Sequence, residues 1–119
     1  MAPETLSQKR CRFTQDVARL IVEAKRRGFE CALDQVKRTH IEANANANAA
    51  SGAGISNSLH LLGLACDLLL YRGGQYLTDT GSYLSLGEYW ESLGAGYAWG
   101  GRFARQDGNH FSIEHNGVK

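Results

Sequence analysis

Two short stretches of the sequence carry histidines and aspartates at spacings that could support chemistry. In SNSLHLLGLACDLLLY, residues 56–71, His60 and Asp67 interrupt an otherwise apolar segment. In QDGNHF, Asp107 lies three residues before His110. Burying an unpaired carboxylate is costly, so Asp67 in such a segment needs a partner.

Metal coordination accounts for these residue types. A catalytic zinc takes three protein ligands from histidine, aspartate or glutamate and leaves a fourth position for water. His60, Asp67 and His110 would supply two nitrogens and an oxygen, and the Asp107 carboxylate is placed to take a proton from the bound water. Spacing alone leaves a second interpretation equally open, in which His60 is a core histidine and Asp67 its buried structural partner. His115 is a competing third ligand.

Length and composition bound the class of protein. The chain has 119 residues, of which 43% are hydrophobic and 21% charged, so we expect residues 1–119 to form one globular domain. The formal net charge of +1 gives no electrostatic case for nucleic acid or a membrane surface. The apolar stretches are too short to span a bilayer, and the first residues do not resemble a secretory signal. Three cysteines without CxxC spacing favour reduced, structural thiols.

The elements that position these residues follow from hydrophobic periodicity. Apolar side chains recur on one stripe of residues 5–28, which predicts a helix with a basic, solvated last turn; a nucleic-acid patch is the alternative for that turn. Short strands are expected at residues 29–33 and 36–39. LGLACDLLLYRGG, residues 62–74, predicts a longer strand, and a late helix is expected around residues 85–93.

The period of the longer strand decides which side chains share a face. Asp67 shares its face with the small residue Ala65, while Cys66 points to the opposite face and is expected in the core. Trp90 is expected to pack the late helix onto the sheet. ANANANAASGAG, residues 43–54, has side chains too small to build a core, which indicates an exposed loop or weak helix beside the site.

The two chemical stretches also match a known pair of motifs. SLHLLGLACD, residues 58–67, resembles the SxHxxGxAxD signature of the zinc D-Ala-D-Ala peptidases, and DGNH, residues 107–110, resembles that family's second signature. YAWGGRF, residues 97–103, is similar to the branch of phage endolysins that act as L-alanyl-D-glutamate peptidases. That branch has aspartate where the vancomycin-resistance dipeptidases have glutamate. The resemblance extends from Phe13 to Ile113.

The resemblance implies a role for each matching residue. His60, Asp67 and His110 would hold Zn²⁺, although two imidazoles and a carboxylate do not strictly select zinc. Asp107 would act as general base and then as general acid. Arg38, in a Lys-Arg-Thr segment, would contact the substrate and stabilise the developing oxyanion.

Three further residues are candidates around this centre. Ser58 matches the serine that helps to bind substrate in the family. Trp99 is a candidate for lining the substrate cleft, and core packing is the alternative. Glu114 is a candidate acceptor for a ligand imidazole. The family's glutamine after the Arg-Thr pair has no counterpart in HIEANA, residues 40–45.

The fold implied by the resemblance is α+β, with a small antiparallel sheet, helices packed on one face and the metal cleft on the other, as in the DD-peptidase (Hedgehog-like) fold. The implied function is that of a monomeric zinc peptidoglycan hydrolase that cleaves the L-alanyl-D-glutamate bond of the bacterial stem peptide. The alternatives are a D,D-carboxypeptidase or dipeptidase that removes terminal D-alanine, or a non-catalytic cell-wall-binding protein. The resemblance also implies that the protein is a phage endolysin. Such a protein would stay in the host cytoplasm until a holin opens the inner membrane and lets it reach the periplasmic peptidoglycan.

Overall fold

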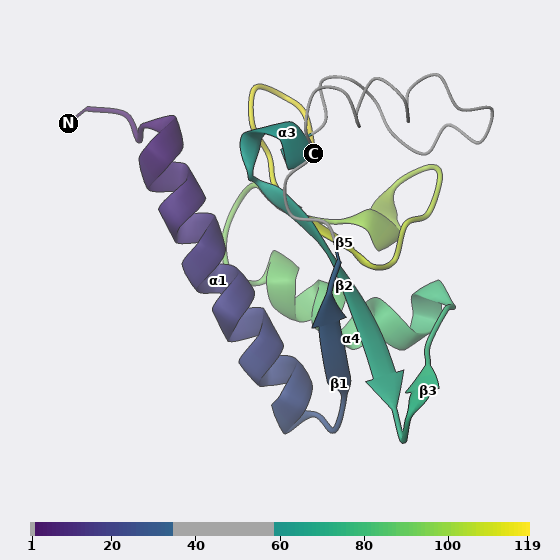
Figure 1. Ribbon diagram of the computed structural model, residues 1–119. Coiled ribbons are helices and arrows are strands. Elements are labelled where there is room, and N and C mark those ends of the chain that lie inside the picture. The colour runs from purple at the N-terminus through teal and green to yellow at the C-terminus, as the bar shows by residue number, and fades with distance from the viewer. Residues whose placement is uncertain (1, 35–58) are drawn as a thin grey trace.

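The computed structural model describes residues 2–34 and 59–119 (Figure 1). Its elements, in chain order, are α1 (Leu6–Arg26), β1 (Glu30–Leu33), α3 (Leu59–Leu62), β2 (Ala65–Arg72), β3 (Gln75–Tyr76), α4 (Thr80–Glu91), β4 (Tyr97–Trp99), the 3-10 turn η1 (Gly100–Arg102) and β5 (His110–Ile113). The helix predicted at residues 5–28 and the strand predicted at 29–33 are both confirmed. The segment at 36–39 and the loop at 43–54 lie outside the described residues.

The strands form one antiparallel sheet in the order β1-β2-β5-β4, and β3 pairs with the end of β2 as a short hairpin. Both long helices, α1 and α4, lie on one side of this sheet (Figure 1). The architecture confirms the α+β class with helices packed on one face. Among the described helices, none is long and apolar enough to cross a membrane.

Helix α1 is defined by its ends and by its buried stripe. Thr5 and Gln8 form a capping box, in which each side chain accepts a hydrogen bond from the other residue's backbone N–H. Phe13 is buried on the stripe, and its ring meets the edge of Trp90 in α4 with centroids 5.8 Å apart. At the other end, Lys25 and Arg26 are exposed, which fits the expectation of a solvated helix end, and Arg27 lies 2.6 Å from the carboxylate of Glu23.

Helix α4 begins at Thr80, five residues before the predicted start at residue 85. Asp79 caps the helix, because its carboxylate accepts hydrogen bonds from the backbone N–H of Ser82 at 3.0 Å and from the Ser82 hydroxyl at 2.7 Å. Glycines at positions 81 and 87 lower the helix propensity of this stretch and obscured that start.

The core lies between the sheet and the two helices. Trp90 is fully buried and its indole N–H donates to the backbone carbonyl of Ser112 in β5 at 2.9 Å, so α4 packs on the sheet as expected. Cys66 in β2 is also fully buried, and burial raises the pKa of its thiol to about 12. All three cysteines are free, which confirms the expectation of structural thiols for Cys66.

Candidate metal centre

Sheet register brings two of the candidate ligands together. In the antiparallel pairing of β2 with β5, Asp67 lies directly opposite His110. The Leu68 N–H continues the pairing by donating to the carbonyl of Asn109 at 2.8 Å. Directly opposed residues of neighbouring strands project from the same face, so this register places the carboxylate beside the imidazole.

The third candidate ligand comes from the short helix that precedes β2. His60 lies in α3, and the chain turns into β2 at Gly63, whose φ is +72°. A Cβ at Gly63 would lie 3.0 Å from Nε of Arg10, an exposed and flexible side chain that can move aside, so the position favours glycine because of its positive φ. Ala65 is fully buried at the start of β2. The turn at Gly63 therefore connects the helix that carries His60 to the strand that carries Asp67.

The three side chains converge on one point. Oδ1 of Asp67 lies 3.6 Å from Nε2 of His60 and 3.7 Å from Nδ1 of His110. One ligand atom from each residue lies within 4.8 Å of the other two. Both distances to the carboxylate are too long for hydrogen bonds. They are close to the separation of about 3.3 Å that tetrahedral zinc bonds of about 2.0–2.1 Å impose on neighbouring ligand atoms.

Burial makes this arrangement unfavourable without a cation. Solvent reaches 4% of the His60 side chain, 9% of His110 and 17% of Asp67. Oδ1 of Asp67 is buried and has no hydrogen-bond partner among the described residues. A buried carboxylate oxygen that faces two imidazoles at non-bonded distances is stabilised by a shared metal ion. The donor set and the geometry therefore fit Zn²⁺, and the distances do not support the hydrogen-bonded pair of core side chains left open by the sequence.

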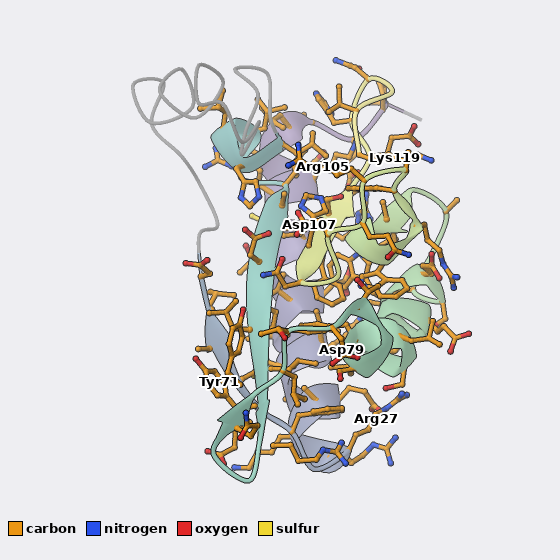
Figure 2. All side chains as sticks on the ribbon, turned by 90° about the vertical axis from the view of Figure 1, so that its right-hand side faces the viewer. Arg27, Tyr71, Asp79, Arg105, Asp107 and Lys119 are labelled. Atoms are coloured by element: carbon orange, nitrogen blue, oxygen red, sulfur yellow. The ribbon has the colours of Figure 1, made fainter. Side chains whose placement is uncertain are left out.

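Asp107 lies in the turn that leads into His110. Its backbone N–H donates to the carbonyl of Gly100 at 2.9 Å, and its carbonyl accepts from the N–H of His110 at 3.1 Å. Its side chain is exposed, and Figure 2 shows it beside the upper half of β2. A Cβ at Gly100 would lie 2.1 Å from the Asp107 carbonyl oxygen, so this glycine allows the turn to approach η1.

Trp99 contacts the turn that contains Asp107. Its exposed fraction is 2%, and its indole N–H donates to the carbonyl of Gly108 at 2.6 Å. The ring lies on Gly87 of α4, where an added Cβ would be 2.1 Å from a Trp99 ring carbon. This burial fits the core-packing alternative for Trp99, while the expectation that it lines the substrate cleft stays a prediction. Its support of the turn was missed by the sequence reasoning, although its place beside two glycines in YAWGGRF was a signal.

The remaining predicted residues divide into two groups. Arg38 and Ser58 lie outside the described residues, so their substrate-binding roles stay predictions. His115 is described: its Nδ1 lies 3.2 Å from Nζ of Lys9, and it is not part of the His60, Asp67 and His110 group. The competing ligand set with His115 is therefore not supported.

Glu114 does not make the contact expected of it within the described part of the chain. Its backbone N–H donates to the carbonyl of Gly96 at 2.8 Å, and no hydrogen bond joins its carboxylate to His110. Nε2 of His110 is buried without a described partner. The expectation that Glu114 orients a ligand imidazole is therefore not supported among the described residues.

Comparison with known proteins decides the family. A family model described as D-alanyl-D-alanine carboxypeptidase matches residues 51–113, a range that contains the three converging side chains and Asp107. The chain belongs to this zinc peptidase family. A search of curated protein sequences finds no match. Among solved structures, the crystal structure of the Serratia marcescens L-Ala D-Glu endopeptidase ChiX matches with a TM-score of 0.67 and 23% sequence identity, over 84% of this chain and 79% of that chain.

These matches establish the general activity and the fold. The family consists of zinc metallopeptidases that act on peptidoglycan, and this peptidase has a His-Asp-His group suited to the metal. The likeness to ChiX shows the shared α+β fold.

Proposed function

We propose that this peptidase hydrolyses the L-alanyl-D-glutamate bond of the peptidoglycan stem peptide and that it uses Zn²⁺. The observation that carries the zinc proposal is the buried Asp67 oxygen, 3.6 Å and 3.7 Å from the nitrogens of His60 and His110. The choice of bond is supported by the fold shared with the Serratia marcescens L-Ala D-Glu endopeptidase ChiX. It is also supported by aspartate, in place of glutamate, at position 107.

Each residue of the candidate site has its own role in the proposed hydrolysis. His60, Asp67 and His110 would hold the zinc, which when bound would supply Lewis acidity and lower the pKa of a water towards about 7. Asp107, exposed and held in the turn before His110, accepts the proton of the attacking water and passes it to the leaving amine. Arg38 stabilises negative charge on the carbonyl oxygen in this proposal.

Covalent catalysis by the neighbouring cysteine is not part of this mechanism. Cys66 precedes Asp67 in β2, but its side chain is fully buried on the core face of the sheet. Because burial raises the pKa of its thiol to about 12, the thiolate is scarce at neutral pH. Water, activated by general-base catalysis, is therefore the nucleophile.

The description of the matching family favours a second candidate, a D,D-carboxypeptidase or dipeptidase that releases terminal D-alanine. Both reactions use the same metal centre and general base, so they differ only in which bond the substrate presents. A muramoyl pentapeptide that ends in D-Ala-D-Ala offers both bonds in one molecule. Mass spectrometry of the products then separates them: a new amino group on D-glutamate supports the endopeptidase, and free D-alanine supports the carboxypeptidase. Neither product from a zinc-loaded protein would support a non-catalytic wall-binding protein.

The endolysin role belongs to the same proposal and is supported by the motif resemblance. A peptidase stored in the cytoplasm of a Gram-negative host is harmless until the inner membrane opens. Expression in such a host should therefore leave the culture density stable, and permeabilising the inner membrane should cause rapid lysis. An Asp107→Asn variant that lyses equally fast would show that lysis does not come from peptide hydrolysis.

A further inference from the structure

A polar recess of about 160 Å³ opens beside the proposed general base. Its walls come from β3 and the segment after it, the start of α4 and the loop before β5. The residues that line it include Tyr76, Thr78, Thr80, Gln106, Asp107 and Asn109, and we call this set the Asp107 recess. We propose that the Asp107 recess binds the sugar to which the stem peptide is attached. This inference rests on the proposed function and names the part of the substrate on one side of the scissile bond.

The walls of the Asp107 recess are fixed by packing. A Cβ at Gly108 would lie 3.0 Å from Cα of Thr80, so the loop before β5 lies directly against the start of α4. The hydroxyl of Tyr83, which also lines the recess, donates to the carbonyl of Leu77 at 2.8 Å and accepts from the N–H of Leu70 at 3.1 Å. These contacts tie the segment after β3 to β2 and α4, so the recess is preformed.

The recess offers hydrogen bonds that the described part of the chain does not use. The side chains of Thr78, Thr80, Gln106 and Asn109 make no hydrogen bond to another described residue. Together they supply two hydroxyls and two amides, groups that both donate and accept. The hydroxyl and N-acetyl groups of a sugar can both donate to and accept from these side chains.

An aromatic side chain at the rim adds the second feature of a sugar site. Tyr76 is 42% exposed, and its ring is held by the ring of Tyr71 with centroids 5.3 Å apart. A partly exposed, anchored ring provides a flat apolar surface for the C–H face of a sugar, at small conformational cost.

Charge decides which side of the scissile bond the recess receives. The residues that line it include no lysine, arginine or histidine, and Asp107 is its charged member. On the leaving side, D-glutamate carries a carboxylate, for which the recess offers no cationic side chain as a partner. On the acyl side, L-alanine is joined by an amide to a muramic acid unit, which is uncharged there and rich in hydroxyl and amide groups. The Asp107 recess therefore suits the acyl side.

Two substrates with the same scissile bond test this inference. The first is N-acetylmuramoyl-L-alanyl-D-glutamyl-diamino acid, and the second carries a plain acetyl group in place of the sugar. We expect the zinc-loaded enzyme to show a kcat/KM roughly tenfold higher for the muramoyl substrate, expressed mainly in KM. Tyr76→Leu and Gln106→Leu should each lower this ratio towards one. Thr14→Val, at an exposed position of α1, should keep the wild-type ratio.

Different results would overturn the sugar recess and the proposed function. Equal kcat/KM values for the two substrates in the wild type would overturn the sugar recess and leave the endopeptidase intact. If neither substrate is cleaved, binding of N-acetylmuramoyl-L-alanine, followed by amide chemical shifts, still decides the question. Shifts at Thr78, Gln106 and Asn109 support the recess, and a saturating titration without shifts there overturns it.

Discussion

At the scale of single residues, the metal centre depends most on Asp67. Its carboxylate is mostly buried between two imidazoles, at distances that exceed a hydrogen bond. The same carboxylate therefore destabilises the metal-free protein and binds the metal in the loaded one. Asp67 is thus expected to lower the stability of the metal-free protein and to raise that of the zinc-loaded protein. A carboxylate with only a structural role would not show this difference.

Asp67→Asn tests this sign change. We expect the variant to lose zinc and peptidase activity, because a neutral amide is a poor zinc ligand. In the metal-free state it should unfold at the same or a higher temperature than the metal-free wild type, with a gain of about 1 kcal/mol from removing a buried charge. Thermal unfolding with and without chelator checks this, and a metal-free variant clearly less stable than the metal-free wild type would contradict it.

Asp107→Asn separates chemistry from metal binding. Asn keeps the size of the side chain but cannot take a proton, so kcat should fall by about 10²- to 10⁴-fold. Because Asp107 is outside the converging group of three side chains, zinc content should stay at one ion per chain in metal analysis. Glu88→Gln, at an exposed position of α4, is the matched control and should retain activity. Loss of zinc in Asp107→Asn would instead make Asp107 a ligand.

Cysteine labelling tests the exclusion of a thiol nucleophile. Burial raises the pKa of Cys66 to about 12, so at pH 8 its thiol stays protonated and inaccessible, while Cys11 is exposed on α1. Iodoacetamide at pH 8 should label Cys11 in the native protein, leave Cys66 unlabelled and preserve activity. Labelling should reach Cys66 only after unfolding. Inactivation in step with modification of Cys66 in the folded protein would contradict the mechanism.

At the scale of elements, the site depends on how a turn, a strand and a helix approach each other. Gly63 turns α3 into β2, Gly100 admits the Asp107 turn, and Gly87 admits the ring of Trp99. Periodicity and motif were enough to predict α1, β2 and the candidate ligands, because these signals are local. The early start of α4 was not predicted because Gly81 lowers the helix propensity of its first turn, and the support of the turn by Trp99 was not predicted because it depends on contacts between distant segments.

Two glycines of α4 allow a matched test of this packing. Alanine is a better helix former than glycine by about 1 kcal/mol, so propensity alone predicts that both substitutions stabilise. At Gly87 an added Cβ would lie 2.1 Å from the Trp99 ring, and we expect Gly87→Ala to lower the free energy of unfolding by about 1–3 kcal/mol. At Gly81 the nearest atom would be 3.3 Å away, so Gly81→Ala should change it by less than about 1 kcal/mol. Denaturant titration measures both, and equal effects would contradict the packing.

At the scale of the whole molecule, the residues that form the core differ from those that form the candidate metal centre. The helices α1 and α4 cover one face of the sheet, where the core lies, and the register of β2 with β5 places Asp67 and His110 opposite each other. Membership of the peptidase family and the convergence of His60, Asp67 and His110 then point to the same centre.

Digestion of purified Gram-negative peptidoglycan, with and without a chelator, tests the central claim most directly. The account predicts fragments with a newly freed amino group on D-glutamate, identified by mass spectrometry. These fragments should disappear when the metal is stripped and return when Zn²⁺ is added. Unchanged cleavage in the metal-free protein, or cleavage only at terminal D-alanine, would contradict the proposed zinc-dependent L-alanyl-D-glutamate endopeptidase.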